Sequence, residues 1–159
     1  NIIDSETINI EPDDNFGTLH DKMMHLGANV LKRTVQAISN GNFTEKPQDE
    51  SSELKHAPKL SKEFCKINWE QPVEQIHNFV RGLSPYPTAH TTISGKSIKI
   101  FESKVELTEV AELPGEFLSD GKNFLKFAAI GGYLHVLDSQ LEGKKRMDIE
   151  SLLRGFKLN

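Results

Sequence analysis

The period of the hydrophobic pattern changes after Pro87, and this change constrains the fold more than any other feature of the sequence. From there on, apolar and polar residues alternate, as they do in half-buried β-strands. Five short segments have this pattern, and they are residues 89–93, 97–105, 115–120, 123–130 and 133–141. An open sheet of this size would expose its edges, so the pattern predicts a small, closed or nearly closed antiparallel barrel.

The pair Gly131-Gly132 separates the last two predicted strands and is typical of a two-residue hairpin. A type I′ turn needs a positive φ angle at both central positions, and glycine adopts such angles without steric cost. We therefore predict a type I′ turn at these two glycines.

The first part of the chain has helical periodicity. Between residues 15 and 42 the apolar side chains recur at three- and four-residue steps, which predicts one long amphipathic helix. Asp14 or Asn15 is expected to cap its start, and the Asn-Gly pair that follows Ser39 is expected to end it. Methionines occur on this helix as neighbours, and their helical spacing favours core filling over a pliable groove for a partner.

Two shorter helices are predicted downstream, at residues 68–82 with Pro72 in the first turn, and at residues 147–155. The polar segment 43–64 contains two prolines and has no sustained period, which is typical of an extended linker. The predicted fold class is therefore mainly β with flanking helices (α+β): a small OB-like barrel preceded by a long helix and an extended linker.

Basic side chains gather in a few places, although the formal net charge of the chain is −4. Residues 51–100 carry seven basic and four acidic side chains, whereas residues 1–50 carry four basic and nine acidic ones. Binding of a polyanion depends on the local potential of a patch more than on the net charge. The candidate phosphate-binding side chains are Lys55, Lys59, Lys62 and Lys66 in the linker region, Lys96 and Lys99 at the second predicted strand, and Lys144, Lys145 and Arg146 near the end of the chain.

Three consecutive cations, Lys144 to Arg146, directly precede the last predicted helix. One interpretation is a solvent-exposed turn. However, cations at the N-terminus of a helix oppose its macrodipole, so stability alone does not favour them there. An anionic ligand at this turn would resolve the conflict, and we therefore predict a phosphate contact.

The second predicted strand places Lys99 and Phe101 on one face, with Lys96 in the turn just before. This arrangement suits a phosphate contact beside a ring on which a base stacks. The alternative is a solvated lysine next to a core phenylalanine, and the sequence leaves both open.

Several classes of site are excluded or disfavoured by the sequence. Cys65 is the only cysteine, so neither an intramolecular disulfide nor a thiolate metal cage is expected. The six histidines have no metal-ligand spacing, and no nucleotide-binding or zinc-protease motif occurs. No pair of residues is marked out as acid and base, and we predict no catalytic, cofactor or metal site. Because no long apolar segment and no signal peptide are present, no membrane partner is expected and the predicted location is cytoplasmic.

Several motifs in order, "HAPKLSKEFCKINW", "NFVRGLSPYPTA", "PGEFL" and "QLEGKKRM…LLRG", resemble the carboxy-terminal half of the methionyl-tRNA formyltransferase family. The resemblance spans nearly the whole chain, and one departure is Asn68, where the family usually has aspartate. It implies an enzyme that transfers a formyl group from 10-formyltetrahydrofolate, its co-substrate, to the amino group of methionyl initiator tRNA. It also implies that this part contributes tRNA binding and is inactive alone, because the family's catalytic motifs do not occur in it.

The resemblance implies three segments, of which residues 1–41 are the tail of an amino-terminal catalytic domain, with a strand and a helix. Residues 42–66 are a basic linker, and residues 67–159 are an OB-like tRNA-binding domain. The implied partners are initiator methionyl-tRNA and the catalytic domain of the same chain, which agrees with a first residue, Asn1, that suggests a piece of a longer protein. Two alternatives remain: the C-terminal domain of a related formyltransferase or hydrolase with a non-tRNA substrate, and a free-standing OB-type nucleic-acid binder.

Overall fold

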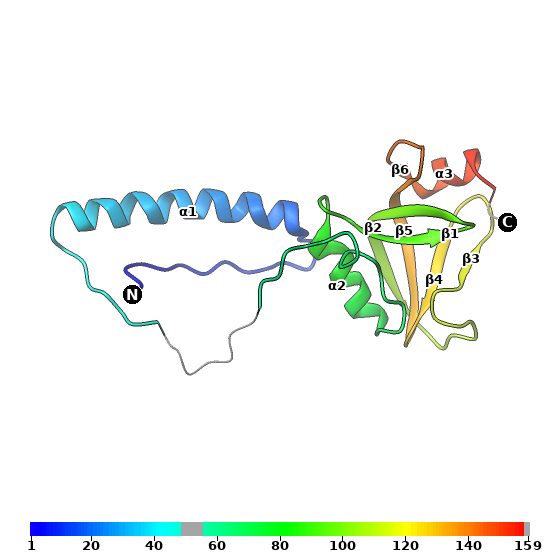
Figure 1. Ribbon diagram of the computed structural model, residues 1–159, viewed down its shortest axis with the longest axis horizontal. Coiled ribbons are helices and arrows are strands. Elements are labelled where there is room, and N and C mark those ends of the chain that lie inside the picture. Colours follow the sequence, from blue (N-terminus) through cyan, green and yellow to red (C-terminus); the bar gives the residue numbers. More distant parts are fainter. Residues whose placement is uncertain (49–55, 158–159) are drawn as a thin grey trace. The chain divides into compact units, whose positions relative to one another are not determined.

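A computed structural model of the chain describes residues 1–48 and 56–157. It contains two compact units, Asn1–Lys59 and Leu60–Asn159. Figure 1 shows the long helix of the first unit and the sheet of the second. None of the helices within the described ranges is long and apolar enough to cross a membrane.

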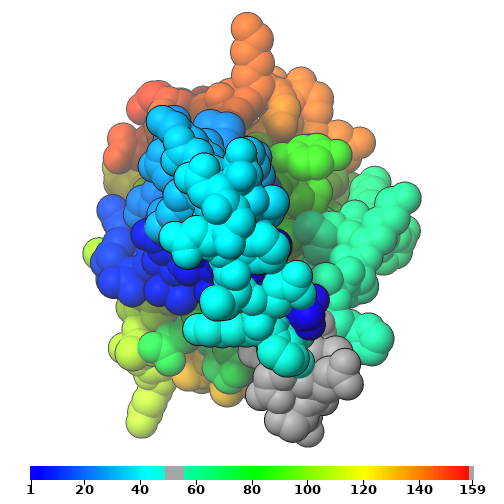
Figure 2. Space-filling model, turned by 90° about the vertical axis from the view of Figure 1, so that its left-hand side faces the viewer, coloured from blue at the N-terminus to red at the C-terminus, as the bar shows by residue number. Residues whose placement is uncertain are grey.

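The first unit is built on the helix α1, Phe16–Ser39, and its ends follow the predicted capping pattern. The Asn15 side chain accepts a hydrogen bond from the Thr18 amide, and the Thr18 hydroxyl accepts one from the Asn15 amide, which forms a capping box. Gly41 has a φ angle of 67°, as expected where the helix ends. In Figure 2 the end of α1 and the segment that follows it, in cyan, lie at the front, beside amino-terminal residues in dark blue.

No residue of α1 is buried, and the expected core role of its methionines is wrong for the described chain. Met23 and Met24 are 54% and 55% exposed, and Leu31 is 65% exposed. An amphipathic helix buries its apolar face only against a second layer, and here an extended segment lies along it. The predicted amino-terminal strand is likewise reduced to one isolated bridge between Ile2 and Lys46, because a strand needs neighbouring strands to pair with.

The second unit contains a curled antiparallel sheet, and each of the five predicted strands is confirmed. The strands are β1 (Ala89–Ile93), β2 (Lys96–Leu107), β3 (Phe117–Ser119), β4 (Leu125–Ala129), β5 (Gly132–Leu141) and the short β6 (Met147–Asp148). Their order is β1-β2-β5-β4-β3, and β6 pairs with β5. The sheet is thus a half-barrel, in which β1 and β3 are the ends of the order and not neighbours.

The type I′ turn that we predicted at Gly131-Gly132 is wrong both in its residues and in its type. The β4–β5 loop consists of Ile130 and Gly131, and only Gly131 of these has a positive φ angle. Gly132 is the first residue of β5, where an added Cβ would overlap the carbonyl oxygen of Glu106 on β2. Glycine at this position therefore reflects the close approach of two strands.

Helix α2, Val73–Leu83, packs its apolar face on the sheet, and the short helix α3, Ile149–Gly155, completes the core. The inner face of the sheet and both helices contribute to one cluster of buried side chains. Trp69 stacks on Phe127 with ring centroids 4.6 Å apart, and its indole NH donates to the Thr91 hydroxyl. This aromatic pair anchors the segment before α2.

Candidate nucleic-acid interface

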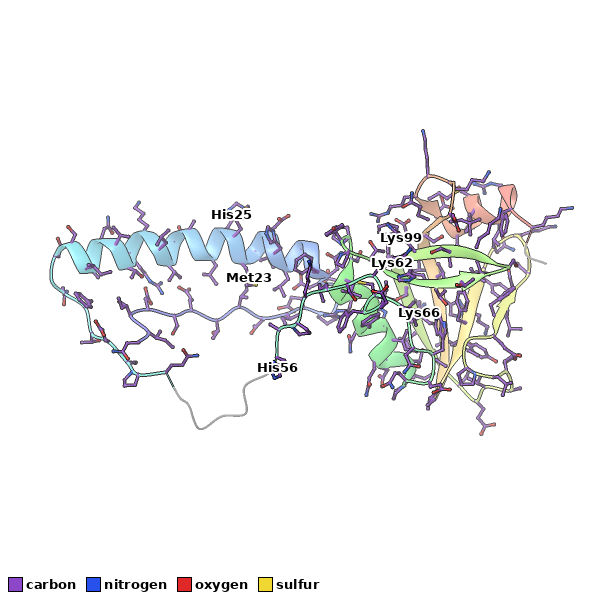
Figure 3. All side chains as sticks on the ribbon, in the orientation of Figure 1. Met23, His25, His56, Lys62, Lys66 and Lys99 are labelled. Carbon is purple, nitrogen blue, oxygen red and sulfur yellow. The ribbon has the colours of Figure 1, made fainter. Side chains whose placement is uncertain are left out.

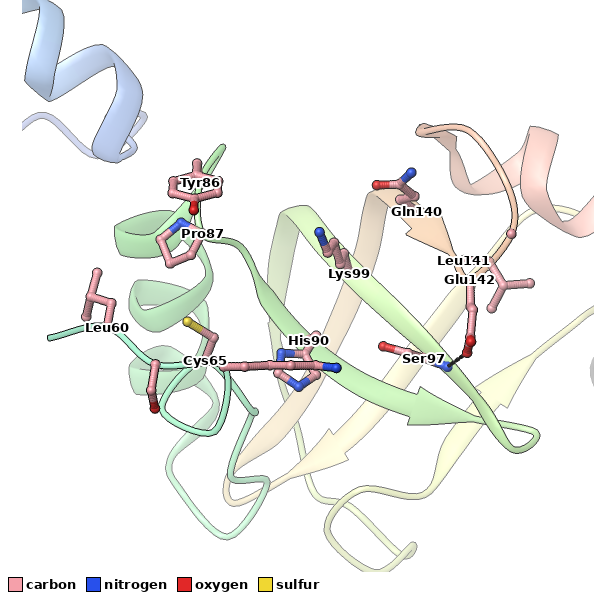
Figure 4. Close-up of a pocket in the computed structure, with 13 residues that line it drawn as sticks. Leu60, Cys65, Tyr86, Pro87, His90, Ser97, Lys99, Gln140, Leu141 and Glu142 are labelled. Atoms are coloured by element: carbon pink, nitrogen blue, oxygen red, sulfur yellow. Dashed lines mark hydrogen bonds between the residues drawn. The ribbon is translucent and has the colours of Figure 1, made fainter.

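A groove of about 620 Å³ lies in the second unit, between the segment around residues 60–65, the loop before β1 and the turn after β5 (Figure 4). Strands β1, β2 and β5 all contribute lining residues, among them His90, Lys99 and Gln140. We call it the β1 groove. Three of the predicted phosphate-binding lysines lie in or beside it.

Backbone pairing brings Lys66 and Lys99 to the two sides of His90. His90 is opposite Lys99 in the β1–β2 ladder. On its other side the amide of His90 donates to the carbonyl of Cys65 at 3.0 Å, and its carbonyl accepts from the amide of Ile67 at 2.9 Å. The positions of Lys66 and Lys99, both labelled in Figure 3, are thus fixed by backbone pairing with His90.

The charges around His90 show that this cluster is cationic. Burial lowers the pKa of His90 below its usual value, and the positive charges of Lys62, Lys66 and Lys99 lower it further. Glu63 acts in the opposite direction and is the weakest of these influences. The three lysines are themselves exposed, so that together they can bind an anion.

The rim of the β1 groove carries Tyr86, whose side chain is 78% exposed. Its loop is held by Thr88, whose hydroxyl donates to the carbonyl of Pro85 at 2.6 Å and whose amide donates to the carbonyl of Leu83 at 2.9 Å. Our sequence reasoning did not select Tyr86 or His90 as site residues. The tyrosine between two prolines in "SPYP" was the available signal, because prolines restrict the loop that presents it.

The three cations in the turn after β5, Lys144 to Arg146, have different surroundings. Arg146 forms an ion pair with Asp138, in which its Nη2 and Nε atoms lie 2.7 and 2.8 Å from the carboxylate oxygen Oδ2. Its guanidinium also lies 4.2 Å from the centre of the Phe101 ring. Lys144 and Lys145 are exposed, and neither ammonium group has a hydrogen bond or ion pair with the described residues. The turn itself is closed by the Lys144 amide, which donates to the carbonyl of Leu141.

We expected these cations to lie at the N-terminus of the last helix, and this expectation is wrong. Helix α3 begins only at Ile149, after β6, and Asp148 caps it by accepting from the Ser151 amide at 2.8 Å. The lysines therefore lie upstream of the cap and not in the first turn of the helix. Arg146, moreover, has a structural role because it is paired with Asp138.

The remaining predicted lysines are placed in different surroundings. Lys96 is the first residue of β2 and not part of the turn, and its ammonium lies 5.1 Å from the centre of the Phe156 ring. Lys59 belongs to the first unit and is exposed. Lys55 lies outside the described residues. Within the described ranges no group of three or more potential metal ligands occurs.

Phe101, which we expected to offer a stacking ring beside Lys99, is already covered by Arg146. The register of β2 and β5 shifts between Ile100 and Glu102, so Phe101 lies at a bulge. A bulge changes the direction of the side chains that follow it, which the alternating pattern does not reveal.

The family model "Formyl transferase, C-terminal domain" matches residues 59–157. The chain is 45% identical over 166 residues to a methionyl-tRNA formyltransferase of Bacteroides fragilis, which covers 99% of this chain and 51% of that protein. It is 42% identical over 159 residues to a methionyl-tRNA formyltransferase of Flavobacterium johnsoniae, and this match covers 98% of this chain and 50% of that protein. The chain thus spans about half the length of these curated relatives.

The fold is also similar to part of a solved structure, that of HypX from Aquifex aeolicus in complex with tetrahydrofolic acid. The TM-score is 0.55 at 20% sequence identity, and the match covers 79% of this chain and 22% of that one. At this identity the likeness supports the fold alone.

Proposed function

We propose that this chain, which belongs to the formyl transferase C-terminal domain family, holds the tRNA substrate of a methionyl-tRNA formyltransferase. In this proposal the intact enzyme transfers a formyl group from 10-formyltetrahydrofolate to methionyl initiator tRNA, at the start of bacterial protein synthesis in the cytoplasm. Residues 1–41 are the tail of its catalytic domain, residues 42–66 are a basic linker, and residues 67–159 are the OB-type domain that contacts RNA. The co-substrate belongs to the catalytic domain and not to the β1 groove.

The observation that carries the proposal is the gathering of Lys62, Lys66 and Lys99 around His90. A patch of this kind attracts a phosphate backbone, and each phosphate that it neutralises releases counterions. Backbone pairing fixes the positions of Lys66 and Lys99. At these two positions only the side chain must become ordered when the RNA backbone binds, so little conformational freedom is lost. These contacts position the RNA and carry little sequence information.

Lys144 and Lys145 form a second candidate contact at the turn after β5. Both are exposed and lack a charged partner in the described chain, so a phosphate would not have to displace an existing ion pair. Gly143, their neighbour, belongs to the lining of the β1 groove, which makes this turn part of the same surface. The proposed RNA path thus follows the β1 groove to the turn after β5.

The test is binding of initiator tRNA to the 159-residue chain across a series of salt concentrations. Replacing Lys62, Lys66 and Lys99 by alanine is expected to weaken binding and to flatten the dependence of log affinity on log salt by about 2 to 3 units, since each phosphate contact contributes about 0.7 to 0.9. The matched control replaces three exposed lysines outside the groove lining, Lys104, Lys122 and Lys157.

An unchanged salt slope in the groove variant, or the same loss in the control variant, would contradict the proposal. Failure of the unmodified chain to bind tRNA would favour the alternative of a related formyltransferase with a non-tRNA substrate. The two relatives described above argue against that alternative, because each of them is a methionyl-tRNA formyltransferase.

A further inference from the structure

We propose that the β1 groove is a subsite for one unpaired nucleotide of the bound RNA, whose base stacks on the ring of Tyr86. The proposal rests on the function proposed above and adds that the contact requires an unpaired base as well as a phosphate. Tyr86 would then help to select where on the RNA the chain binds. No base in an intact duplex presents its face in this way.

The exposure of Tyr86 is the first argument. A tyrosine ring that is 78% exposed contributes little to the core, and the described chain places no ring or cation against it. Two other aromatic rings near the basic residues are already in contact with a cation, Phe101 with Arg146 and Phe156 with Lys96. Among the described residues that line the β1 groove, Tyr86 is the one Phe, Tyr or Trp side chain, and its ring remains open to a ligand.

The rigidity of its loop is the second argument. Pro85 and Pro87 flank Tyr86, and Thr88 fixes the loop through two hydrogen bonds to the carbonyls of Pro85 and Leu83. A ring presented from a fixed backbone loses only side-chain freedom when a base stacks on it. Stacking platforms for unpaired bases have this character, because every base offers a π-face to an aromatic ring.

The composition of the groove is the third argument. Its volume of about 620 Å³ lies in the range of small-ligand sites. Leu60, Pro87 and Leu141 supply apolar surface, and Ser97 and Gln140 supply polar groups. The lining also contains Glu142, whose carboxylate accepts a hydrogen bond from the Ser97 amide. Lys62 and Lys99 stand in the same lining, so a base and its phosphate could be bound together (Figure 4). The cations favour a nucleotide over an apolar peptide as the occupant, since a peptide of that kind would leave them unpaired.

The experiment replaces Tyr86 by phenylalanine and by leucine and measures tRNA binding by the 159-residue chain at several salt concentrations. Phenylalanine keeps the ring, so Tyr86→Phe should bind within about twofold of the unmodified chain. Leucine keeps apolar bulk without a π-face, and Tyr86→Leu should bind about 5- to 50-fold more weakly at every salt concentration. Because no phosphate contact is lost, the salt slope should stay the same.

The control is Phe16→Leu, which removes a ring that is 47% exposed on α1 in the first unit, and it should leave affinity unchanged. Equal affinity of Tyr86→Leu and Tyr86→Phe would overturn the inference, and so would a lower salt slope in Tyr86→Leu. Either result would leave the proposed function intact as long as the lysine variant still loses salt dependence. If the lysine variant also behaves like the unmodified chain, the proposed function itself fails.

A second readout does not depend on affinity. In Tyr86→Trp the new indole should stack on a base, so its fluorescence should fall when tRNA is added. The unmodified chain supplies the reference, because its single tryptophan, Trp69, is packed on Phe127. Full emission from Tyr86→Trp at saturating tRNA would contradict stacking, even if the affinities had followed the expected order.

Discussion

The three neighbouring cations of the turn after β5 should respond differently to replacement. Alanine at Lys144 and Lys145 removes two exposed charges that have no charged partner within the described residues. Alanine at Arg146 removes an ion pair with Asp138 and a cation–π contact with Phe101. We expect the first change to affect RNA binding alone, and the second to affect the stability of the second unit as well.

The magnitude for Arg146 follows from its contacts. An exposed ion pair contributes about 0.2 to 1 kcal/mol, and an exposed cation–π contact about 0.5 to 1 kcal/mol. Asp138 has its other carboxylate oxygen, Oδ1, buried without a hydrogen-bond partner in the described chain, so loss of Arg146 leaves that carboxylate poorly compensated. Arg146→Ala should therefore cost about 1 to 2 kcal/mol, which for a unit of this size lowers Tm by about 5 to 15 °C.

The assay is thermal unfolding of both variants together with tRNA binding over a salt series. Lys144→Ala with Lys145→Ala should keep the Tm and reduce the salt slope by about 1.4 to 1.8 units, at about 0.7 to 0.9 for each contact. Arg146→Lys serves as the control, because it keeps a positive charge but not the paired geometry of guanidinium and carboxylate. The reasoning is refuted if Arg146→Ala melts like the unmodified chain, or if the double lysine variant loses stability.

Two further predictions concern the groove and the sheet beside it. Gly132→Ala should destabilise the second unit by about 2 kcal/mol or more in a denaturant titration, because its methyl group would overlap the Glu106 carbonyl oxygen. Unfolding at the same denaturant concentration as the unmodified chain would contradict this reading of Gly132. His90, whose pKa is lowered by burial and by nearby lysines, should gain a proton when phosphate binds, so tRNA affinity should rise as pH falls from about 7.5 to about 5.5, and this rise should be smaller in His90→Gln.

The strands could be predicted because their signal is local. Alternation of apolar and polar residues marks a strand without knowledge of its neighbours, and five of the six strands were found in this way. The two-residue β6 is too short for such a pattern, and its residues were assigned to the last predicted helix. Closure of the sheet has no such signal. Whether β1 meets β3 depends on the curl of the whole sheet, and the half-barrel order β1-β2-β5-β4-β3 was not visible in the sequence. The turn at Gly131 was misplaced for a related reason, since the need for glycine at position 132 comes from Glu106 on another strand.

For α1, the sequence predicts the helix but not the surface that would cover its apolar face. Helical spacing correctly predicted the helix, and it correctly placed its apolar side chains on one face. The spacing does not tell which surface covers that face, and in the described chain Leu31 and Val35 remain largely exposed. The proposed catalytic domain is the partner that would bury them.

The basic residues of the candidate site can be read from the sequence, but the strand pairing that brings them together cannot. Lys66, His90 and Lys99 are far apart in the sequence, and each looks unremarkable alone; two backbone pairings bring them together. Strand pairing has a period of two, so a shift of β2 by one residue would turn Lys99 into the core and the buried Ile100 to the surface. The core residues that fix the register of β2 therefore also hold the lysine in the groove. Any sequence that keeps this core keeps position 99 in the groove. The position of Lys99 is therefore a consequence of folding, and only its charge is a matter of RNA binding.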